Sequence, residues 1–180
     1  MHRQICKGKM GTMLNSHIDV LQQAVDLLNT ISSEDFQKVM QPHLSGSIGQ
    51  HIRHVVDHYL ALESGFESGL IDYNQRNRDA NIEVSVVAAK ETIQAVQAWF
   101  ATLTSADLQK SIEVRSEISI SARINDDCAS TLAREIMFVS SHAIHHYSII
   151  GIIRSIQGQS VPEFFGYAPA TISYLTDRCE

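Results

Sequence analysis

The chain has 180 residues, 44% of them hydrophobic, and 20 acidic against 14 basic side chains give it a formal net charge of −6. This length suits one well-filled core and is short for two, so we expect a single domain over residues 1–180. Lysines and arginines form no cluster, which argues against a nucleic-acid partner. We also expect no signal peptide and no membrane span, and therefore a cytoplasmic protein without a membrane partner.

The N-terminal part predicts a flexible segment followed by two helices. No periodic pattern starts within residues 1–12, which we expect to be flexible. Ser32, which precedes acidic residues, is typical of a helix N-cap and predicts a short helix that Pro42 ends. Between these features, residues 13–28 repeat apolar side chains at intervals of three and four, as one face of a helix does: Met13, Leu14, Ile18, Leu21, Val25 and Leu28.

Two further long helices are predicted in the middle of the chain. One begins near Ser47 and ends at the glycines Gly65 and Gly69. A polar connection over residues 72–81 separates it from the next helix, at residues 86–103. The first of the two carries the apolar stripe Ile48, Ile52, Val55, Val56, Tyr59, Leu62 and Phe66.

Residues 112–124 alternate apolar and polar side chains, with the apolar ones at even-numbered positions. A period of two is typical of a β-strand. We favour a two-stranded hairpin that turns near residues 115–117, and one extended edge segment is the alternative.

The last long helix is expected to start after Asp126 and Asp127 and to end near Gly158, and Pro169 suits the first turn of a short terminal helix. Four long helices predict an all-α fold, an antiparallel four-helix bundle with at least one long crossover. A small β-hairpin insertion precedes the last bundle helix. Bundles of this kind bind metals between facing helices.

Six of the nine histidines lie on two of these predicted helices: His51, His54 and His58 on one, and His142, His145 and His146 on the other. His142 and His146 are four residues apart, so they project from the same side of a helix. With one histidine from the other helix they make a three-nitrogen site for divalent zinc, nickel or iron. Three protein ligands leave coordination positions open, which is typical of a catalytic site. The alternative is that these imidazoles are partly buried groups hydrogen-bonded to backbone or solvent.

The segments SIGQHIRHVVDHY and SSHAIHHY resemble the DinB/YfiT superfamily of metal-dependent four-helix-bundle proteins. In that superfamily a histidine on the second helix joins an HxxxH pair on the last bundle helix. The register of the family, counted from Ser47, implies His54, His142 and His146 as the metal ligands. His51 is the rival to His54, because it lies nearer the apolar stripe.

The resemblance and the helix positions together indicate further residues around the ligands. Many family members continue the HxxHH pattern with an RGQ-like sequence, whereas this chain has Tyr147-Ser148-Ile149, so its pocket wall is expected to differ there. Glu135 lies two turns before His142 and is expected to orient a ligand or accept a proton, with an ordinary ion pair to Arg134 as the alternative. The candidates for lining the pocket or supporting the ligands are His51, His58, His145, Glu135 and Tyr147.

The resemblance implies a metal-dependent enzyme with a small-molecule substrate. The family chemistry is thiol-dependent S-transfer, isomerisation or hydrolysis with low-molecular-weight thiols, and the sequence assigns no catalytic residue. The alternative is a non-catalytic helical bundle that binds a small ligand or a partner, with a structural metal or none. Under either function we expect the chain to form a homodimer, because dimers are common in bundle families.

Overall fold

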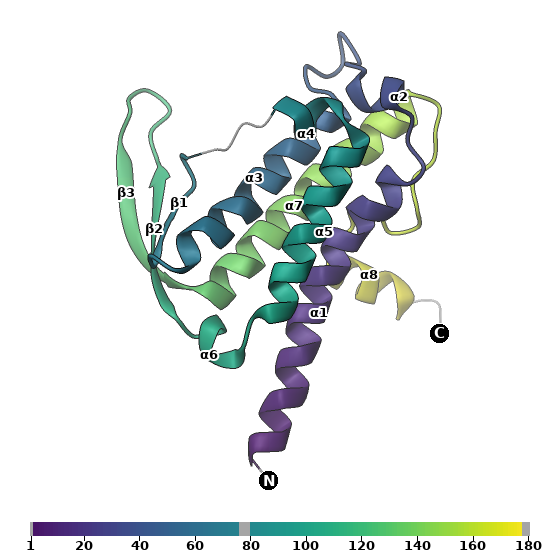
Figure 1. Ribbon diagram of the computed structural model, residues 1–180. Helices are drawn as coiled ribbons and strands as arrows, with labels where there is room; N and C mark the ends of the chain where they lie inside the picture. The colour runs from purple at the N-terminus through teal and green to yellow at the C-terminus, as the bar shows by residue number, and fades with distance from the viewer. Residues whose placement is uncertain (1, 76–79, 178–180) are drawn as a thin grey trace.

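The chain is mostly helical, with one small sheet at one end (Figure 1). The computed structural model describes residues 2–75 and 80–177, with side chains described from residue 13. The long helices are α1 (His2–Leu28), α3 (Ile48–Phe66), α5 (Val86–Thr102) and α7 (Leu132–Ile156). The short helices are α2 (Ser33–Gln37), α4 (Ala80–Val84), α6 (Ser105–Leu108) and α8 (Pro169–Thr176).

The four long helices pack side by side in the order α1, α5, α3 and α7, and α7 also contacts α1. Figure 1 shows α1 and α7 running in one direction and α3 and α5 in the other. Neighbouring helices are therefore not all antiparallel, unlike the predicted arrangement. The described parts of the crossover, residues 67–75 and 80–85, lie against opposite ends of α3, so α3 and α5 start at the same end of the fold.

Two glycines of α3 allow this crossover to pack closely against the helix. A Cβ atom at Gly49 would collide with the backbone of Glu83 in α4. A Cβ atom at Gly65 would collide with the backbone of Leu70, the first residue of β1 (Leu70–Asp72). Both ends of the crossover are thereby packed onto α3, the helix that carries three histidines.

The sheet is mixed. Strand β1 pairs in parallel with β2 (Ser111–Glu117), which pairs antiparallel with β3 (Asn125–Thr131). The predicted hairpin corresponds to β2 and β3, but its turn lies at residues 118–124 and not at 115–117. The alternating pattern misled us because Ile118, Ile120 and Ile124 belong to this turn and are exposed. The parallel partner β1 was not predicted.

The observed helix starts agree with the predicted ones where a capping residue marks them. Ser47 and Gln50 form a reciprocal capping box at the start of α3, and Ser32 caps α2. By contrast, α7 begins at Leu132, later than predicted, because residues after Asp127 extend β3. Helix α1 begins at His2 and covers residues 2–12, for which flexibility stays a prediction.

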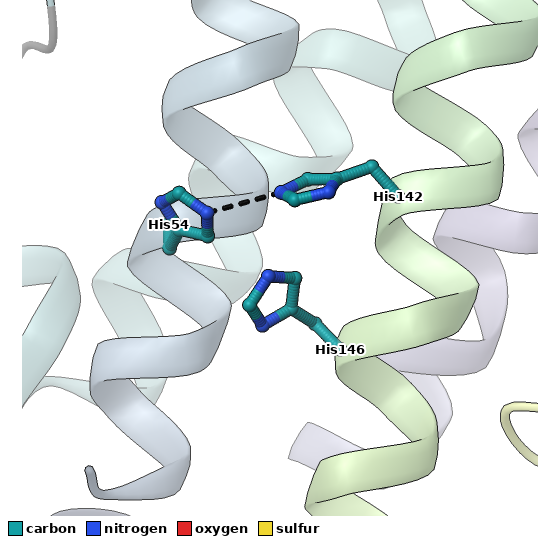
Figure 2. A group of neighbouring side chains, drawn as sticks. All are labelled: His54, His142 and His146. Atoms are coloured by element: carbon teal, nitrogen blue, oxygen red, sulfur yellow. Dashed lines mark hydrogen bonds between the residues drawn. The ribbon is translucent and has the colours of Figure 1, made fainter. Parts of the chain in front are cut away.

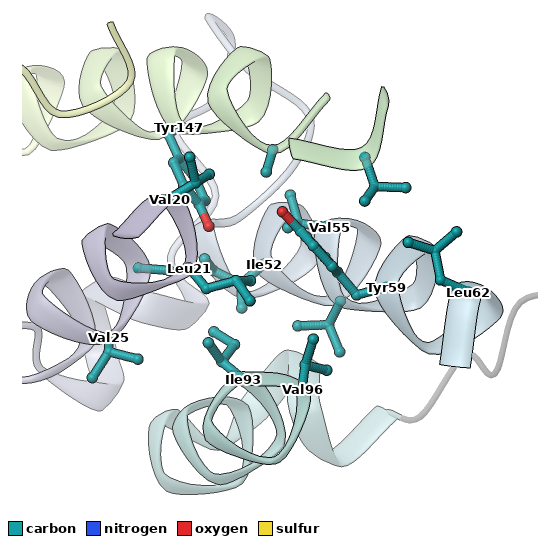
Figure 3. Close-up of a cluster of buried hydrophobic side chains, with 14 of the residues drawn as sticks. Val20, Leu21, Val25, Ile52, Val55, Tyr59, Leu62, Ile93, Val96 and Tyr147 are labelled. Atoms are coloured by element: carbon teal, nitrogen blue, oxygen red, sulfur yellow. The ribbon is translucent and has the colours of Figure 1, made fainter. Parts of the chain in front are cut away.

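The core lies between the long helices (Figure 3). All four contribute buried side chains to it, among them Leu21, Val25, Ile52, Tyr59, Ile93, Val96 and Tyr147. Among the described residues, α7 is the one helix that is long and apolar enough to cross a membrane, although we expected none. The core helix of a globular fold meets the same criterion, so α7 is weak evidence for a membrane span.

Candidate metal centre

Histidines of α3 and α7 meet where these two helices face each other. On α3 the side chains of Ile52, Val55 and Tyr59 are buried in the core. The histidines lie beside that stripe and are partly buried. The same division holds on α7, where Ala143 is buried and His142, its neighbour, is half-buried. The helical repeat therefore places the imidazoles at the rim of the core.

His54, His142 and His146 point toward one another from the two helices (Figure 2). One ligand-capable nitrogen of each lies within 4.8 Å of the others. The Nε2 atoms of His54 and His142 are 3.0 Å apart. The ring centre of His146 lies 4.7 Å from that of His54 and 4.6 Å from that of His142. The structure thus brings together the three residues that the family register implied.

His51 and His58 lie at the two ends of this group. His51 Nδ1 is 2.9 Å from Nδ1 of His146. At the other end, Nδ1 of His58 donates to the backbone carbonyl of His54 at 2.9 Å, and its ring centre is 4.4 Å from that of His142. His54 lies between them and adjoins both histidines of α7, which favours it over His51 as the ligand from α3.

The protonation state of the cluster suits metal binding. Burial, together with smaller contributions from the neighbouring His142 and His51, lowers the pKa of His146 to about 3. Burial, with a smaller contribution from His145, also lowers the pKa of His51. A neutral imidazole has the nitrogen lone pair that a cation needs. His146 and His51 are therefore neutral near neutral pH.

Glu135 lies on α7 and supports the cluster through another residue. Its buried carboxylate accepts hydrogen bonds from the Tyr73 hydroxyl at 2.8 Å, the Ser130 hydroxyl at 2.6 Å and Arg134 at 2.7 Å. The ring of Tyr73 stacks on His58 with centres 5.4 Å apart. The ion pair with Arg134, which the sequence left as the alternative, is thus present together with a link to the histidines.

Two other predicted pocket residues differ in how near they lie to the ligands. His145 is exposed, with its ring centre 5.3 Å from that of His146, and faces a shallow hollow shared with Ser148 and Tyr167. Tyr147 is buried in the core and stacks on Phe165 with centres 5.2 Å apart. One residue along a helix is a rotation of about 100°, which turns Tyr147 away from the side that presents His146. The structure does not bring Tyr147 to the histidines.

Two aromatic neighbours of the site were missed from the sequence. Phe138 lies nearly parallel to His142, with an angle of 18° between the rings and centres 6.1 Å apart. Its position four residues before His142 was a usable signal. Tyr73 comes from the crossover, and no local pattern connects it to helices α3 and α7.

The residues present fit a divalent cation. Three imidazoles from two packed helices offer nitrogen donors of the type that zinc, nickel and iron bind. Cys128, the free cysteine whose side chain the structure describes, is exposed on β3 and is not part of this group. The donors come from segments far apart in the chain. The site therefore depends on the fold to bring His54 to the local His142 and His146 pair.

Comparisons with known proteins agree with this reading. The sequence profile of the DinB family matches residues 5–164. FK506-binding protein 5 of Rhizopus delemar is 26% identical over 162 residues, which cover 90% of this chain and 38% of that protein. This chain thus spans less than half the length of that fungal relative. The crystal structure of a DinB-like protein, YjoA of Bacillus subtilis, superposes with a TM-score of 0.61 at 14% identity, covering 87% of this chain and 99% of the other, and so shows a shared fold. The profile match extends over most of the sequence, and the chain belongs to the DinB family.

Proposed function

We propose that this chain is a metal-dependent enzyme, built as a DinB-type four-helix bundle, whose divalent cation is bound by His54, His142 and His146. The observation that supports this most strongly is the convergence of three nitrogens from α3 and α7 within 4.8 Å. Membership of the DinB family, which is metal-binding, points the same way. Zinc, nickel and iron all suit imidazole ligands.

The bound cation would supply open coordination positions and lower the pKa of a water or thiol placed there. The protein's own groups prepare this site. Burial keeps His146 neutral, and the hydrogen bond from His58 Nδ1 to the His54 carbonyl sets the orientation of the His58 ring.

The resemblance to the superfamily supports our choice of substrate class. We propose a small-molecule substrate and a low-molecular-weight thiol, with S-transfer or hydrolysis as the reaction. A cytoplasmic location and a homodimeric assembly are part of the same proposal. A screen of low-molecular-weight thiols with model electrophiles tests the reaction. Turnover by the metal-loaded protein that disappears in His142→Ala supports an enzyme.

Metal content of the purified protein tests the ligand set. We expect about one equivalent of divalent metal per chain in the unchanged protein and almost none in His142→Ala or His146→Ala. His43→Ala is the matched control, because His43 is exposed in the loop before α3. Ordinary occupancy in His142→Ala would defeat the proposal.

The same measurement separates the two rival ligands of α3. We expect His54→Ala to lose the metal and His51→Ala to keep it, since His54 adjoins both histidines of α7. The opposite result would move the ligand to His51 and leave the rest of the site in place.

A non-catalytic binding module is the second candidate. It is favoured by the fungal relative, which is named as an FK506-binding protein and of which this chain covers 38%. A structural cation should contribute several kcal/mol to folding, so a chelator would lower the melting temperature strongly. A mild loss of stability together with abolished turnover favours the enzyme instead.

A further inference from the structure

A row of side chains continues from the histidines toward the N-terminal end of α7. Arg134, Phe138, His142 and His146 follow one another at intervals of four residues and so share one side of the helix. The ring of Phe138 stacks on that of His142, and the guanidinium carbon of Arg134 lies 5.3 Å from the Phe138 ring centre. The row therefore connects the candidate metal centre to the positively charged guanidinium of Arg134.

Tyr73 forms the other side of this surface. Its ring centre lies 5.4 Å from that of His58 and 5.5 Å from that of Phe138. Its hydroxyl donates to Oε2 of Glu135, which is 1% exposed. The hydrogen bond and the ring contacts hold Tyr73 in place, so the surface is formed before a ligand arrives. We call the surface made by Tyr73, Phe138 and Arg134 the aromatic shelf.

The aromatic shelf is accessible to a ligand. Phe138 is 38% exposed although it is a large apolar ring, and the Arg134 side chain is 65% exposed. An exposed aromatic ring beside a cluster of histidines offers contact area to a flat apolar group. The exposed part of the Phe138 ring is thus open to contact with a ligand.

The charge of the aromatic shelf favours an anion. Arg134 uses NH1 to bind Glu135, and a guanidinium has five N–H donors in all. Glu135 is buried and Arg134 is exposed, so the end of this ion pair that a ligand meets is the cation. A guanidinium binds a carboxylate with two parallel hydrogen bonds better than an ammonium does.

We propose that the aromatic shelf is the substrate-binding surface of the candidate metal centre and that it binds an anionic molecule with a flat apolar group. The acid group meets Arg134, the flat group lies on Phe138 and Tyr73, and the reacting group points to the histidines. This inference rests on the proposed function. Arg134 and His142 are eight residues apart, about 12 Å along the helix, which sets the length of the ligand.

Binding of 2-naphthoate to the full chain tests this inference, with 2-naphthamide as the uncharged probe of the same shape. Titration calorimetry on the metal-loaded and metal-stripped protein measures both. We expect the acid to bind at least about tenfold more tightly than the amide in both forms. Arg134→Gln should remove this difference without weakening the amide, and Arg134→Lys should restore part of it. Phe138→Ala should weaken both probes, whereas Arg123→Gln, at an exposed arginine of the β2–β3 turn, should change neither.

The possible outcomes separate this inference from the proposed function. Equal affinity for acid and amide in the unchanged chain overturns the aromatic shelf, and this comparison needs no variant to fold. Binding of the acid that vanishes on metal removal and ignores Arg134→Gln also overturns it, because the carboxylate is then bound by the cation. Absence of metal uptake by the unchanged chain overturns the proposed function and removes the reaction that the aromatic shelf would serve.

Discussion

Helix α7 has two faces with different roles: one carries candidate metal ligands and the other packs in the core. One face presents His142 and His146 to α3, and the other buries Ala143 and Tyr147 in the core. His146 and Tyr147 are adjacent in the sequence, but His146 is half-buried and Tyr147 is fully buried. The core face holds the helix against its neighbours, so the imidazoles on the other face are positioned before a cation arrives. This separation allows stability and metal binding to be changed independently.

The largest expected effect is on the core face. Tyr147→Ala should lower the free energy of unfolding by about 3 to 5 kcal/mol, because it empties the volume of a buried aromatic ring. Denaturant unfolding measures the loss. Ile152→Ala, at a position that is 55% exposed on the same helix, is the control and should cost less than about 1 kcal/mol. Equal losses in the two variants would contradict the division between the faces.

Metal loading tests the histidine face. Zinc at 100 times its dissociation constant should raise the free energy of unfolding by about 2.7 kcal/mol, since it binds the folded chain alone. His146→Ala should show almost none of this gain, and His43→Ala should show all of it. Thermal unfolding with and without chelator measures both. A full gain in His146→Ala would place the cation elsewhere.

The link between the crossover and the histidines should have a smaller effect. Tyr73→Phe removes the hydrogen bond to Glu135 and should cost about 1.5 kcal/mol, because that carboxylate keeps two other donors. Metal content should stay unchanged. Tyr167→Phe, at an exposed tyrosine of the tail, should lie within about 0.5 kcal/mol of the unchanged protein. If Tyr73→Phe and Tyr167→Phe had the same free energy of unfolding, the hydrogen bond from Tyr73 to Glu135 would not stabilise the fold.

Acid sensitivity of the metal-free protein is the smallest expected effect. Burial lowers the pKa of His146 from 6.5 to about 3, so between these values the unfolded chain binds a proton that the folded chain does not. The stabilisation is complete above pH 6.5 and is lost as the pH falls through this window. The slope cannot exceed about 1.4 kcal/mol per pH unit and is reduced by solvent screening, because the ring is half-buried.

The matched experiment compares His146→Gln with His43→Gln by denaturant unfolding between pH 5 and 7. The first variant should flatten the dependence on pH and the second should leave it as it is. An unchanged slope in His146→Gln would show that this imidazole titrates normally in the folded chain.

Much of the fold and of the site could be predicted from the sequence, because both depend on helical periodicity. The apolar stripes located the four long helices, and the spacing of His142 and His146 marked one side of α7. The choice of His54 needed the family register as well, since periodicity alone favoured His51. Capping residues such as Ser47 located the helix starts closely.

The parts that failed depend on contacts between distant segments. The sequence does not show that β1 pairs with β2, or that Tyr73 reaches His58 from the crossover. The exposed isoleucines at 118 and 120 imitate a strand, and only the paired strands show that they belong to a turn. A separate, local failure is Tyr147, which was assigned to the pocket wall because it follows the HxxHH histidines in the family pattern, although the helical rotation turns it into the core.

Anomalous scattering from crystals of the metal-loaded protein would locate the cation itself. We expect one strong peak between α3 and α7, with Nε2 of His54 and one nitrogen each of His142 and His146 about 2.0 to 2.1 Å from it. A peak bound by other residues, or imidazoles of α3 and α7 turned apart with no peak between them, would contradict it.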